Sequence, residues 1–236
     1  MYFASSVLTR LNKTGGKLFL DGPNFNEPVS LLGKTAVITG GNTGLGKETA
    51  LKLYTLGADT IILCRDSNKA KAAIDDIRQR SKQTGNLKNS LSYVNLDLTS
   101  LKKIEESATE LKKITDRIDI LVNNAGVMAI PSRELTSDGF EKHIGINHLG
   151  HFALTGHLLS LLKKSPSSRV VSVSSAAHLL ADKGIASDPN LIISKPEYEP
   201  WTAYGNSKLA NVLFTKKLAE KLGSSSNIIP LVCHPG

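Results

Sequence analysis

The sequence predicts an α/β fold in which a doubly wound parallel sheet lies between two layers of helices, a three-layer α/β/α architecture. Six short apolar runs rich in β-branched residues alternate with segments whose apolar residues recur at helical spacing. A glycine-rich turn directly follows the first of these runs. The length of 236 residues, with 40% hydrophobic and 21% charged side chains, suits an ordinary globular chain, and we find no internal repeat or second domain.

Each predicted strand is a short apolar run, and a predicted helix separates it from the next. The strands are expected at residues 34–39, 59–64, 91–96, 118–124, 169–175 and 228–233, and the helices at about 47–57, 68–83, 100–115, 138–164 and 202–222. The first three elements, KTAVIT, KETALKLYTLG and DTIILC, form one strand–helix–strand unit. Because such units join parallel strands and place helices on the faces of the sheet, their repetition predicts a parallel sheet covered on both sides.

The net charge of +8 suggests nucleic acid as a partner, but the arrangement of the charges argues against it. Lysines are interleaved with acids, as in KKIEESATELKKITDR, which is typical of a solvated helix face. Aromatic residues make up only 5% of the chain, too few for a base-stacking surface. No apolar stretch approaches the roughly 18 residues needed to span a bilayer, so no transmembrane helix is expected, and peripheral membrane contact stays open.

Two further features concern the compartment and the domain boundary. Cys64 and Cys233 lie in short apolar runs, which predicts two buried thiols in a reducing, intracellular compartment. Residues 1–33 carry Arg10, Lys13 and Lys17 before the first acid, and end in a loop-like stretch rich in Pro and Gly. We interpret them as an N-terminal extension, with an organelle-targeting segment as the alternative to a cytoplasmic protein, and residues 34–236 as the folded domain.

The glycine-rich turn TGGNTGLGKETA has two phosphate interpretations. From Gly41 it begins like a nucleoside-triphosphate loop with Lys47 on the phosphates, but Glu48 stands where that loop needs a hydroxyl for magnesium. The favoured interpretation takes Gly40, Gly44 and Gly46 as a turn that lets a pyrophosphate approach backbone amides at a helix N-terminus. The turn then binds a dinucleotide, with Asn42, Thr43 and Leu45 as the other contact residues.

The residue that ends the second strand discriminates between dinucleotides, because an NADP site offers a cation to the 2′-phosphate and an NAD site an acid to the ribose. Arg65 is therefore predicted to bind the 2′-phosphate of NADP(H), with Lys47 as a second cation. Asp66 keeps NAD(H) as the minority interpretation. Asp97, beside Leu98 at the end of the third strand, is placed to accept the adenine amino group or to cap the following helix.

The predicted catalytic residues lie in the carboxyl-terminal half of the chain. Tyr204 and Lys208 are four residues apart on a predicted helix and share one face, where an ammonium group favours the phenolate form of its neighbour. Ser174 and Ser175 end a strand, at the edge where a doubly wound sheet binds ligands. Asn147 belongs to the long helix before that strand.

Taken together, these motifs resemble the short-chain dehydrogenase/reductase family. The resemblance covers about residues 34–236 and rests on TGGNTGLG, NNAG at 123–126, and the YxxxK spacing of Tyr204 and Lys208. The additional stretches CRD, NNAGVM, DGFEKHIGINHLGHFALT, SSAAH and AYGNSKLANVLF are similar to the retinol-dehydrogenase-like branch. A Rossmann-like sheet is what this resemblance implies for the fold.

The resemblance also implies a role for each matching residue. Tyr204 would exchange a proton with the reacting oxygen, Lys208 would assist it and hold the nicotinamide ribose, and Ser175, with Ser174 as runner-up, would hydrogen-bond that oxygen. Asn147 would support a proton relay to Lys208. The remaining cofactor contacts would come from residues that follow two other strands: Asn123, Asn124, Ala125, Gly126, Pro235 and Gly236.

The function expected from this resemblance is NADP-dependent interconversion of an alcohol and a carbonyl on an apolar small molecule of retinoid, steroid or lipid-aldehyde type, by a chain that can form homo-oligomers. The family's chain normally continues after the Pro-Gly turn, so we expect this domain to lack the last family strand and the substrate lid, and a catalytically weak cofactor-binding regulatory protein is the alternative. His143, His148 and His151 are close in sequence, but without a carboxylate or cysteine to complete a ligand set we expect packing and no metal.

Overall fold

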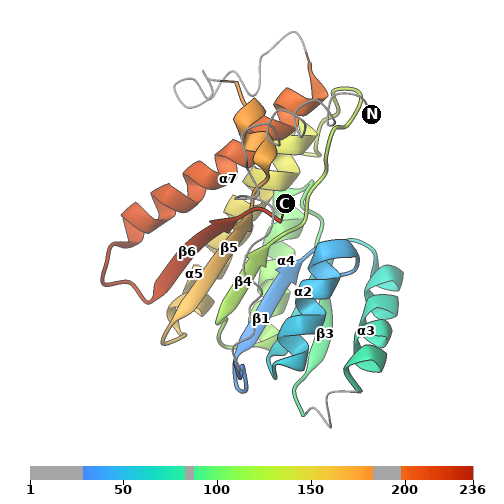
Figure 1. Cartoon of the computed structure of the whole chain (residues 1–236), viewed down its shortest axis with the longest axis vertical. Coiled ribbons are helices and arrows are strands. Elements are labelled where there is room, and N and C mark those ends of the chain that lie inside the picture. The colour runs from blue at the N-terminus through green and yellow to red at the C-terminus, as the bar shows by residue number, and fades with distance from the viewer. Residues whose placement is uncertain (1–28, 83–87, 183–197, 236) are drawn as a thin grey trace, which may run out of the picture.

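The computed structural model describes residues 29–82, 88–182 and 198–235. In these residues six strands form one parallel sheet: β1 (Thr35–Thr39), β2 (Asp59–Cys64), β3 (Leu91–Asn95), β4 (Ile120–Asn123), β5 (Ser168–Val173) and β6 (Ile228–Cys233). Their order across the sheet is β3-β2-β1-β4-β5-β6 (Figure 1). The chain winds outward from β1, returns to place β4 beside it and winds outward on the other side, which confirms the predicted Rossmann-like α/β fold.

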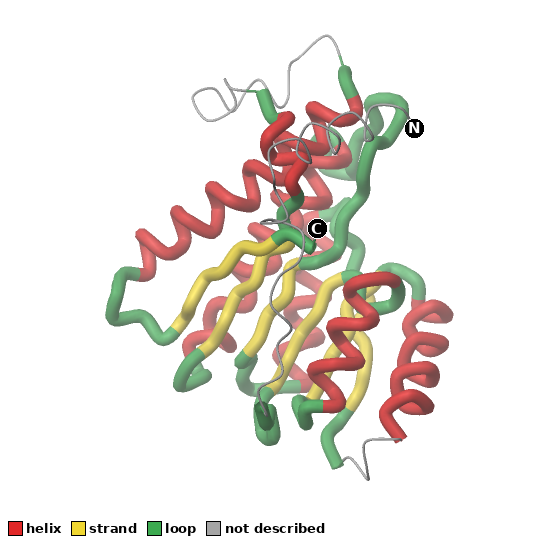
Figure 2. Tube along the Cα trace, in the orientation of Figure 1, coloured by secondary structure: helices red, strands yellow, loops and turns green. Residues whose placement is uncertain are grey.

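In the described part of the chain, five long helices cover the two faces of the sheet, so that the sheet forms the middle layer (Figure 2). On one face lie α2 (Gly44–Thr55) and α3 (Ser67–Ser81), whose buried residues pack on β1, β2 and β3. On the other lie α4 (Leu101–Ile114), α5 (Gly150–Lys163) and α7 (Pro200–Leu222). Two separate apolar clusters, one on each face, therefore hold the domain together.

The two faces differ in how completely they are covered. Among the described residues, α2 and α3 pack on β1 to β3, and no helix packs on the same face of the edge strand β6. Ile229 and Leu231 there are 40% and 42% exposed. For the same reason Cys233 is exposed, and its predicted burial is wrong, whereas Cys64 in the interior strand β2 is buried as predicted.

The helix predicted to begin at residue 138 begins at Lys142 instead. Residues 135–141 form a tight turn, in which Leu135 and Glu141 form an isolated antiparallel bridge and Gly139 has a φ of +83°. The Glu141 carboxylate then accepts hydrogen bonds from the amides of His143 and Ile144, which fixes the start of the helix. Its first turns form the π-helix η2 (Ile144–Leu149), which continues directly into α5.

The ends of β1 and β4 are joined by hydrogen bonds at the point where the winding reverses. Thr39 Oγ1 accepts from the amides of Asn124 and Ala125, both at 2.9 Å, and Asn124 Nδ2 donates to the Thr39 carbonyl at 2.8 Å. In an open α/β sheet, ligands bind in the crevice outside the strand ends at this reversal. The fold therefore places the candidate site at the edge where β1, β4 and β5 end.

Part of the predicted N-terminal extension is attached to this fold. Residues 1–28 lie outside the described residues. The Leu31 amide donates to the Leu56 carbonyl at 2.7 Å, and the Leu31 side chain packs against the cluster under α2 and α3. The stretch just before residue 34 is thus continuous with the domain.

Candidate active site

Backbone contacts that only glycine allows shape the turn between β1 and α2. Gly40 has a φ of +67°, and a Cβ on Gly46 would lie 2.3 Å from the Gly40 carbonyl oxygen and 2.5 Å from Asn124 Nδ2. The predicted contact residues of the turn are half-buried or exposed: Asn42, Thr43, Gly44 and Leu45. Thr43 makes no side-chain capping bond to α2, so this helix N-terminus is accessible to an anionic group of a ligand.

Lys47 and Glu48, on which the triphosphate interpretation depends, are both paired with α3. Lys47 Nζ lies 3.0 Å from Asp76 Oδ2, and the Arg80 guanidinium contacts both Glu48 carboxylate oxygens, at 2.7 and 2.8 Å. The hydrogen bond from Arg80 lowers the pKa of Glu48. An ionised carboxylate therefore occupies the position where a triphosphate loop needs a hydroxyl, and Lys47 is held by α3 rather than free to assist Arg65.

Arg65 and Asp66, at the end of β2, differ in how far they are already engaged. The Asp66 carboxylate caps α3 by accepting from the amides of Asn68 and Lys69, and the bond from Lys69, the larger effect, lowers its pKa. Arg65 is exposed, and its guanidinium has no hydrogen-bond or ion-pair partner among the residues described. The cation is thus free for a ligand, while the acid already has a structural role.

Asp97 follows β3 and lies at the same edge of the sheet. It accepts hydrogen bonds from the Thr99 amide and hydroxyl, and Lys103 Nζ lies 3.4 Å away. Burial alone would raise the pKa of Asp97, but these hydrogen bonds outweigh it and the pKa is lowered. The N-cap of α4 is Ser100, so the expected capping role of Asp97 is wrong; the neighbouring Leu98 is buried in the core.

Residues after β4 approach η2 and α7, which carry Asn147 and Lys208. A Cβ on Gly126 would lie 3.0 Å from Asn147 Oδ1 and 3.6 Å from Lys208 Nζ. The fully buried Asn147 accepts a hydrogen bond from the Val127 amide and donates to the Val127 carbonyl and to Ser207 Oγ. The π-helix thus connects the loop after β4 to α7, and π-turns recur at functional sites.

Tyr204 and Lys208 lie together on the buried face of α7, as their spacing predicts. Lys208 Nζ lies 5.6 Å from the centre of the Tyr204 ring and donates a hydrogen bond to the Val173 carbonyl at 3.0 Å. The two residues are 9% and 4% exposed. Burial lowers the pKa of Lys208 from 10.5 to about 8, so this ammonium is destabilised in the protein and suited to proton exchange.

The two serines at the end of β5 have different partners. Ser174 is buried and donates its hydroxyl hydrogen to the Lys208 carbonyl at 2.8 Å, which joins β5 to α7. Ser175 is half-buried and caps the short 3₁₀ helix η3 (Ala176–Leu180), accepting from the Ala177 amide at 3.2 Å. The Ser175 hydroxyl retains a hydrogen to donate. Pro235 follows β6 at this edge and is exposed, and Gly236 lies outside the described residues.

Comparisons with known proteins identify the family of this fold and site. The short chain dehydrogenase family matches residues 34–187. This chain is a short-chain dehydrogenase. It is 42% identical over 220 residues to human retinol dehydrogenase 13, covering 93% of this chain and 63% of that protein, and 40% identical to mouse retinol dehydrogenase 14, covering 100% and 74%.

This short-chain dehydrogenase belongs to the retinol-dehydrogenase-like branch, and it spans about two thirds of the length of the relatives it matches. A solved protein from Mycobacterium paratuberculosis superposes with a TM-score of 0.74 at 40% identity, covering 88% of this chain and 70% of that one. The Pseudomonas aeruginosa RhlG/NADP complex gives 0.65 at 27% identity, covering 86% and 71%. No helix in the described part of the dehydrogenase is long and apolar enough to cross a membrane.

His148 in η2 and His151 in α5 both take part in hydrogen bonds within the protein. His151 bridges Thr39 Oγ1 and the Asn147 carbonyl, and burial lowers its pKa to about 4. His148 hydrogen-bonds Asn211 and packs against Phe214. Among the described residues no three His, Cys, Asp or Glu side chains are grouped as metal ligands.

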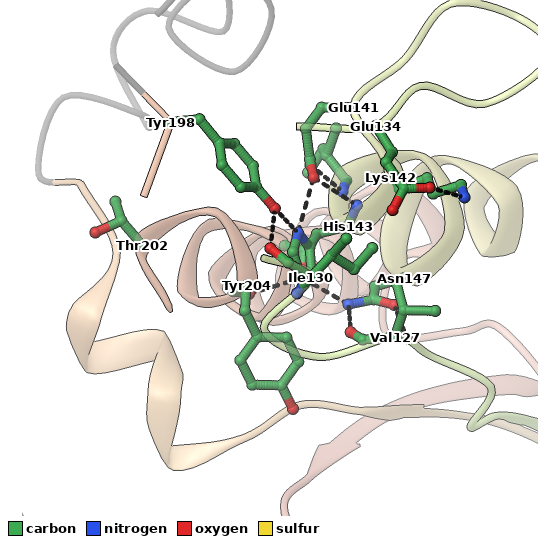
Figure 3. Close-up of polar contacts among 12 residues, drawn as sticks. Val127, Ile130, Glu134, Glu141, Lys142, His143, Asn147, Tyr198, Thr202 and Tyr204 are labelled. Atoms are coloured by element: carbon green, nitrogen blue, oxygen red, sulfur yellow. Dashed lines mark hydrogen bonds and ion pairs between the residues drawn. The ribbon is translucent and has the colours of Figure 1, made fainter. Parts of the chain in front are cut away.

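Sequence reasoning missed several polar residues next to Tyr204 (Figure 3). His143 packs edge-on against the Tyr204 ring at 6.1 Å between centroids, and Trp201 does so at 6.2 Å. Tyr198 stacks on His143. Tyr198 and Trp201 lie six and three positions before Tyr204, and this nearness in the sequence was a signal for those two residues. His143 lies 61 positions before Tyr204, so no local pattern indicated its contact with the Tyr204 ring.

An apolar groove lies elsewhere on the dehydrogenase, between α5 and α7. Its volume is about 490 Å³, and residues lining it include Phe152, Leu159, Leu213 and Phe214. His148 also lines this groove, but Tyr204, Ser175 and the glycine turn do not. The groove therefore belongs to the outer surface of these helices and not to the candidate active site.

Proposed function

We propose that this short-chain dehydrogenase is an NADP-dependent oxidoreductase that interconverts an alcohol and a carbonyl on an apolar small molecule. The observation that carries this proposal is the buried pair on α7, in which the Lys208 ammonium lies 5.6 Å from the Tyr204 ring centre and has a pKa of about 8. A phenol beside a desolvated ammonium can donate a proton to a carbonyl oxygen, or accept one from an alcohol.

Each further residue has a role that its contacts support. Tyr204 exchanges the proton, Lys208 stabilises the phenolate that forms, and the Ser175 hydroxyl donates a hydrogen bond to the reacting oxygen. The Ser174 hydroxyl is engaged with the Lys208 carbonyl, which favours Ser175 for this role. Asn147 holds the loop after β4 at a fixed distance from α7 and supports proton exchange at Lys208.

The cofactor that fits this chain is a nicotinamide dinucleotide. The close packing at Gly40 and Gly46 leaves the N-terminus of α2 open to a pyrophosphate, and Asp97, Asn124, Ala125, Gly126, Pro235 and Gly236 would provide the remaining contacts. The bound cofactor supplies or takes up the hydride. Because Arg65 is free and Asp66 is engaged in capping α3, we propose NADP(H) over NAD(H), and the RhlG/NADP complex among the related structures supports this choice.

The substrate class is proposed from the surroundings of Tyr204. Met128, Leu179 and Trp201 are exposed on the loop after β4, on η3 and on the first turn of α7, so apolar side chains lie on three segments next to the site. The relatives are named retinol dehydrogenases. An apolar alcohol or aldehyde of retinoid size therefore suits this protein. The alternative of a cofactor-binding protein without turnover is less favoured, because Tyr204, Lys208, Ser175 and Asn147 are all present and Tyr204 and Lys208 adjoin.

Replacing Tyr204 with phenylalanine tests the proposal. Tyr204→Phe removes the proton donor but keeps the ring between His143 and Trp201, so we expect NADPH-dependent reduction of retinal to fall by about 10²–10⁴-fold. The shift of the melting temperature by NADPH should persist. Tyr93→Phe, on the distant strand β3, is the matched control and should keep full activity.

Two outcomes would contradict the proposal. Equal reductase activity in Tyr204→Phe and wild type would remove Tyr204 from the chemistry. NADPH binding by the wild type, together with no turnover of any apolar aldehyde or alcohol offered, would support the regulatory alternative.

A further inference from the structure

The loop after β4 contains a strained residue close to Tyr204. Ala129 has a φ of +49°, the left-handed region that costs a non-glycine residue about 1–2 kcal/mol. It is the single non-glycine residue with positive φ in the described part of the chain. Such strain persists only where the surroundings hold the backbone in place, so the contacts on either side of Ala129 need explanation.

Side chains hold the loop at two points, one on each side of Ala129 (Figure 3). On the N-terminal side, Asn147 pairs with both the amide and the carbonyl of Val127, at 2.8 and 3.0 Å. On the C-terminal side, the Ile130 amide donates to His143 Nε2 at 3.2 Å, and Tyr198 Oη donates to the Ile130 carbonyl at 2.8 Å. Every backbone polar group of Val127 and Ile130 therefore has a side-chain partner.

Glu141 determines which ring nitrogen of His143 can accept a hydrogen bond from the Ile130 amide. Its Oε1 lies 2.7 Å from His143 Nδ1, and both side chains are buried. Burial alone would raise the pKa of Glu141, but its hydrogen bonds to His143 outweigh this and lower it, so the carboxylate is ionised and can only accept. The hydrogen is then assigned to Nδ1, which leaves Nε2 as the acceptor that the Ile130 amide requires.

His143 also contacts the proposed proton donor, Tyr204. The His143 ring packs against Tyr204 at 6.1 Å and stacks on Tyr198 at 6.4 Å with an interplanar angle of 23°. One buried ring therefore touches Tyr204 and also holds Ile130. A displacement of the loop at Ile130 changes the packing around Tyr204 and the position of Met128, which lies between the two held points and is 61% exposed.

We propose that His143 and Tyr198 are positioning residues that hold the strained loop at Ala129 and Ile130, and thereby place the loop at the substrate side of Tyr204. Glu141 supports them by fixing the orientation of the His143 ring. The proposal rests on the oxidoreductase function proposed above. It assigns these residues an effect on the carbonyl substrate and not on the nucleotide, because the residues after β4 that are proposed to contact the cofactor end at Gly126, before the two held points at Val127 and Ile130.

Tyr198→Phe tests the proposal with the smallest perturbation, since it removes one hydroxyl and keeps the ring stacked on His143. We expect the KM for retinal to rise about fivefold to tenfold, kcat to change less, and the dissociation constant of NADPH to stay within twofold. Backbone hydrogen exchange in residues 127–131, followed by mass spectrometry on the full chain, should accelerate about tenfold. Tyr93→Phe is the control and should change neither quantity.

A second substitution separates positioning from general destabilisation. Glycine adopts a φ of +49° without the steric penalty, so Ala129→Gly in the Tyr198→Phe background should lower the energy of the held loop conformation. The KM for retinal and the exchange rate of residues 127–131 should then return most of the way to their wild-type values. His143→Phe removes both ring nitrogens and should have a larger effect on the same quantities. If His143→Phe does not fold, the comparison of Tyr198→Phe with the double variant Tyr198→Phe/Ala129→Gly still tests the proposal.

The proposal is overturned if residues 127–131 exchange at the wild-type rate in Tyr198→Phe, or if Ala129→Gly recovers nothing. A wild-type protein without hydride transfer would refute the proposed function instead. The exchange measurement would still decide whether His143 and Tyr198 hold the loop, so the two failures are distinguishable.

Discussion

The edge of the sheet where ligands are expected to bind is built differently on its two sides. Beside β1 and β2, the backbone forms the candidate site: glycines bring Gly40, Gly46 and the start of α2 together, and the nearby charged side chains lie at the surface. Beside β4 and β5, buried polar side chains form it, with Asn147, Tyr204 and Lys208 all less than a tenth exposed.

This difference has consequences for how each side tolerates change. A backbone cradle is fixed by sterics, so a single added methyl group disrupts it, while its surface cation can be removed at little cost to folding. In a buried polar network, removing a charged group from water lowers the free energy of unfolding of the protein. Such a network is kept where the reaction needs the charged group, so the protein is less stable there than it could be. Substitutions on the two sides should therefore differ in what they do to binding, turnover and stability.

Gly46→Ala should have the largest effect on the β1 side. Its Cβ would lie 2.3 Å from the Gly40 carbonyl oxygen, a contact that the backbone cannot relieve without moving the turn. We expect the melting temperature to show no shift with NADPH at concentrations that stabilise the wild type by about 2.7 kcal/mol, and reductase activity to be lost. Gly156→Ala is the control, because a Cβ there meets nothing within 4 Å. A normal NADPH shift in Gly46→Ala would show that the turn does not bind the nucleotide.

Lys208→Met should separate turnover from stability on the β5 side. Reductase activity should fall by about 10²–10³-fold. Stability without cofactor should rise at pH 7, because the buried ammonium, whose pKa is lowered from 10.5 to about 8, is removed. The shift corresponds to about 3 kcal/mol; the lost hydrogen bond to Val173 offsets about 1 kcal/mol.

The pH dependence of this difference follows from the sign of the shift. Below pH 8 Lys208 is charged in both the folded and the unfolded wild type, so its full desolvation penalty is present. Between pH 8 and 10.5 the folded protein loses the proton first, and the advantage of the variant should shrink until it disappears. Urea denaturation at several pH values measures the difference in unfolding free energy between Lys208→Met and the wild type. Lys217→Met, on the exposed side of α7, is the control. A variant less stable than the wild type at pH 7 would contradict the desolvation of Lys208.

The contrast also explains what the sequence could predict. The parallel sheet covered on both faces follows from the alternation of apolar runs with helical segments, and the glycine turn and the Tyr204–Lys208 spacing are local patterns, so all three could be predicted from the sequence. His143 and Tyr198 meet only because two segments 55 positions apart fold together, and no local spacing indicates this. The start of the helix at Lys142 depends on the Glu141 cap and the Gly139 turn, which override helical periodicity. The exposure of Cys233 depends on what covers the edge strand, which a run of apolar letters does not specify.

Arg65→Ala should have the smallest effect and is the most selective test of the β2 side. Arg65 is exposed and has no ion-pair partner among the described residues, so its removal should leave stability within about 0.5 kcal/mol. A charge-assisted contact to a 2′-phosphate contributes about 1.5–3 kcal/mol, so the dissociation constant of NADPH should rise about tenfold to 100-fold. That of NADH should not change. Arg169→Ala, an exposed arginine on β5, is the control for net charge. If both nucleotides weaken equally, Arg65 contacts a group that they share, and the preference for NADP has to arise from another residue.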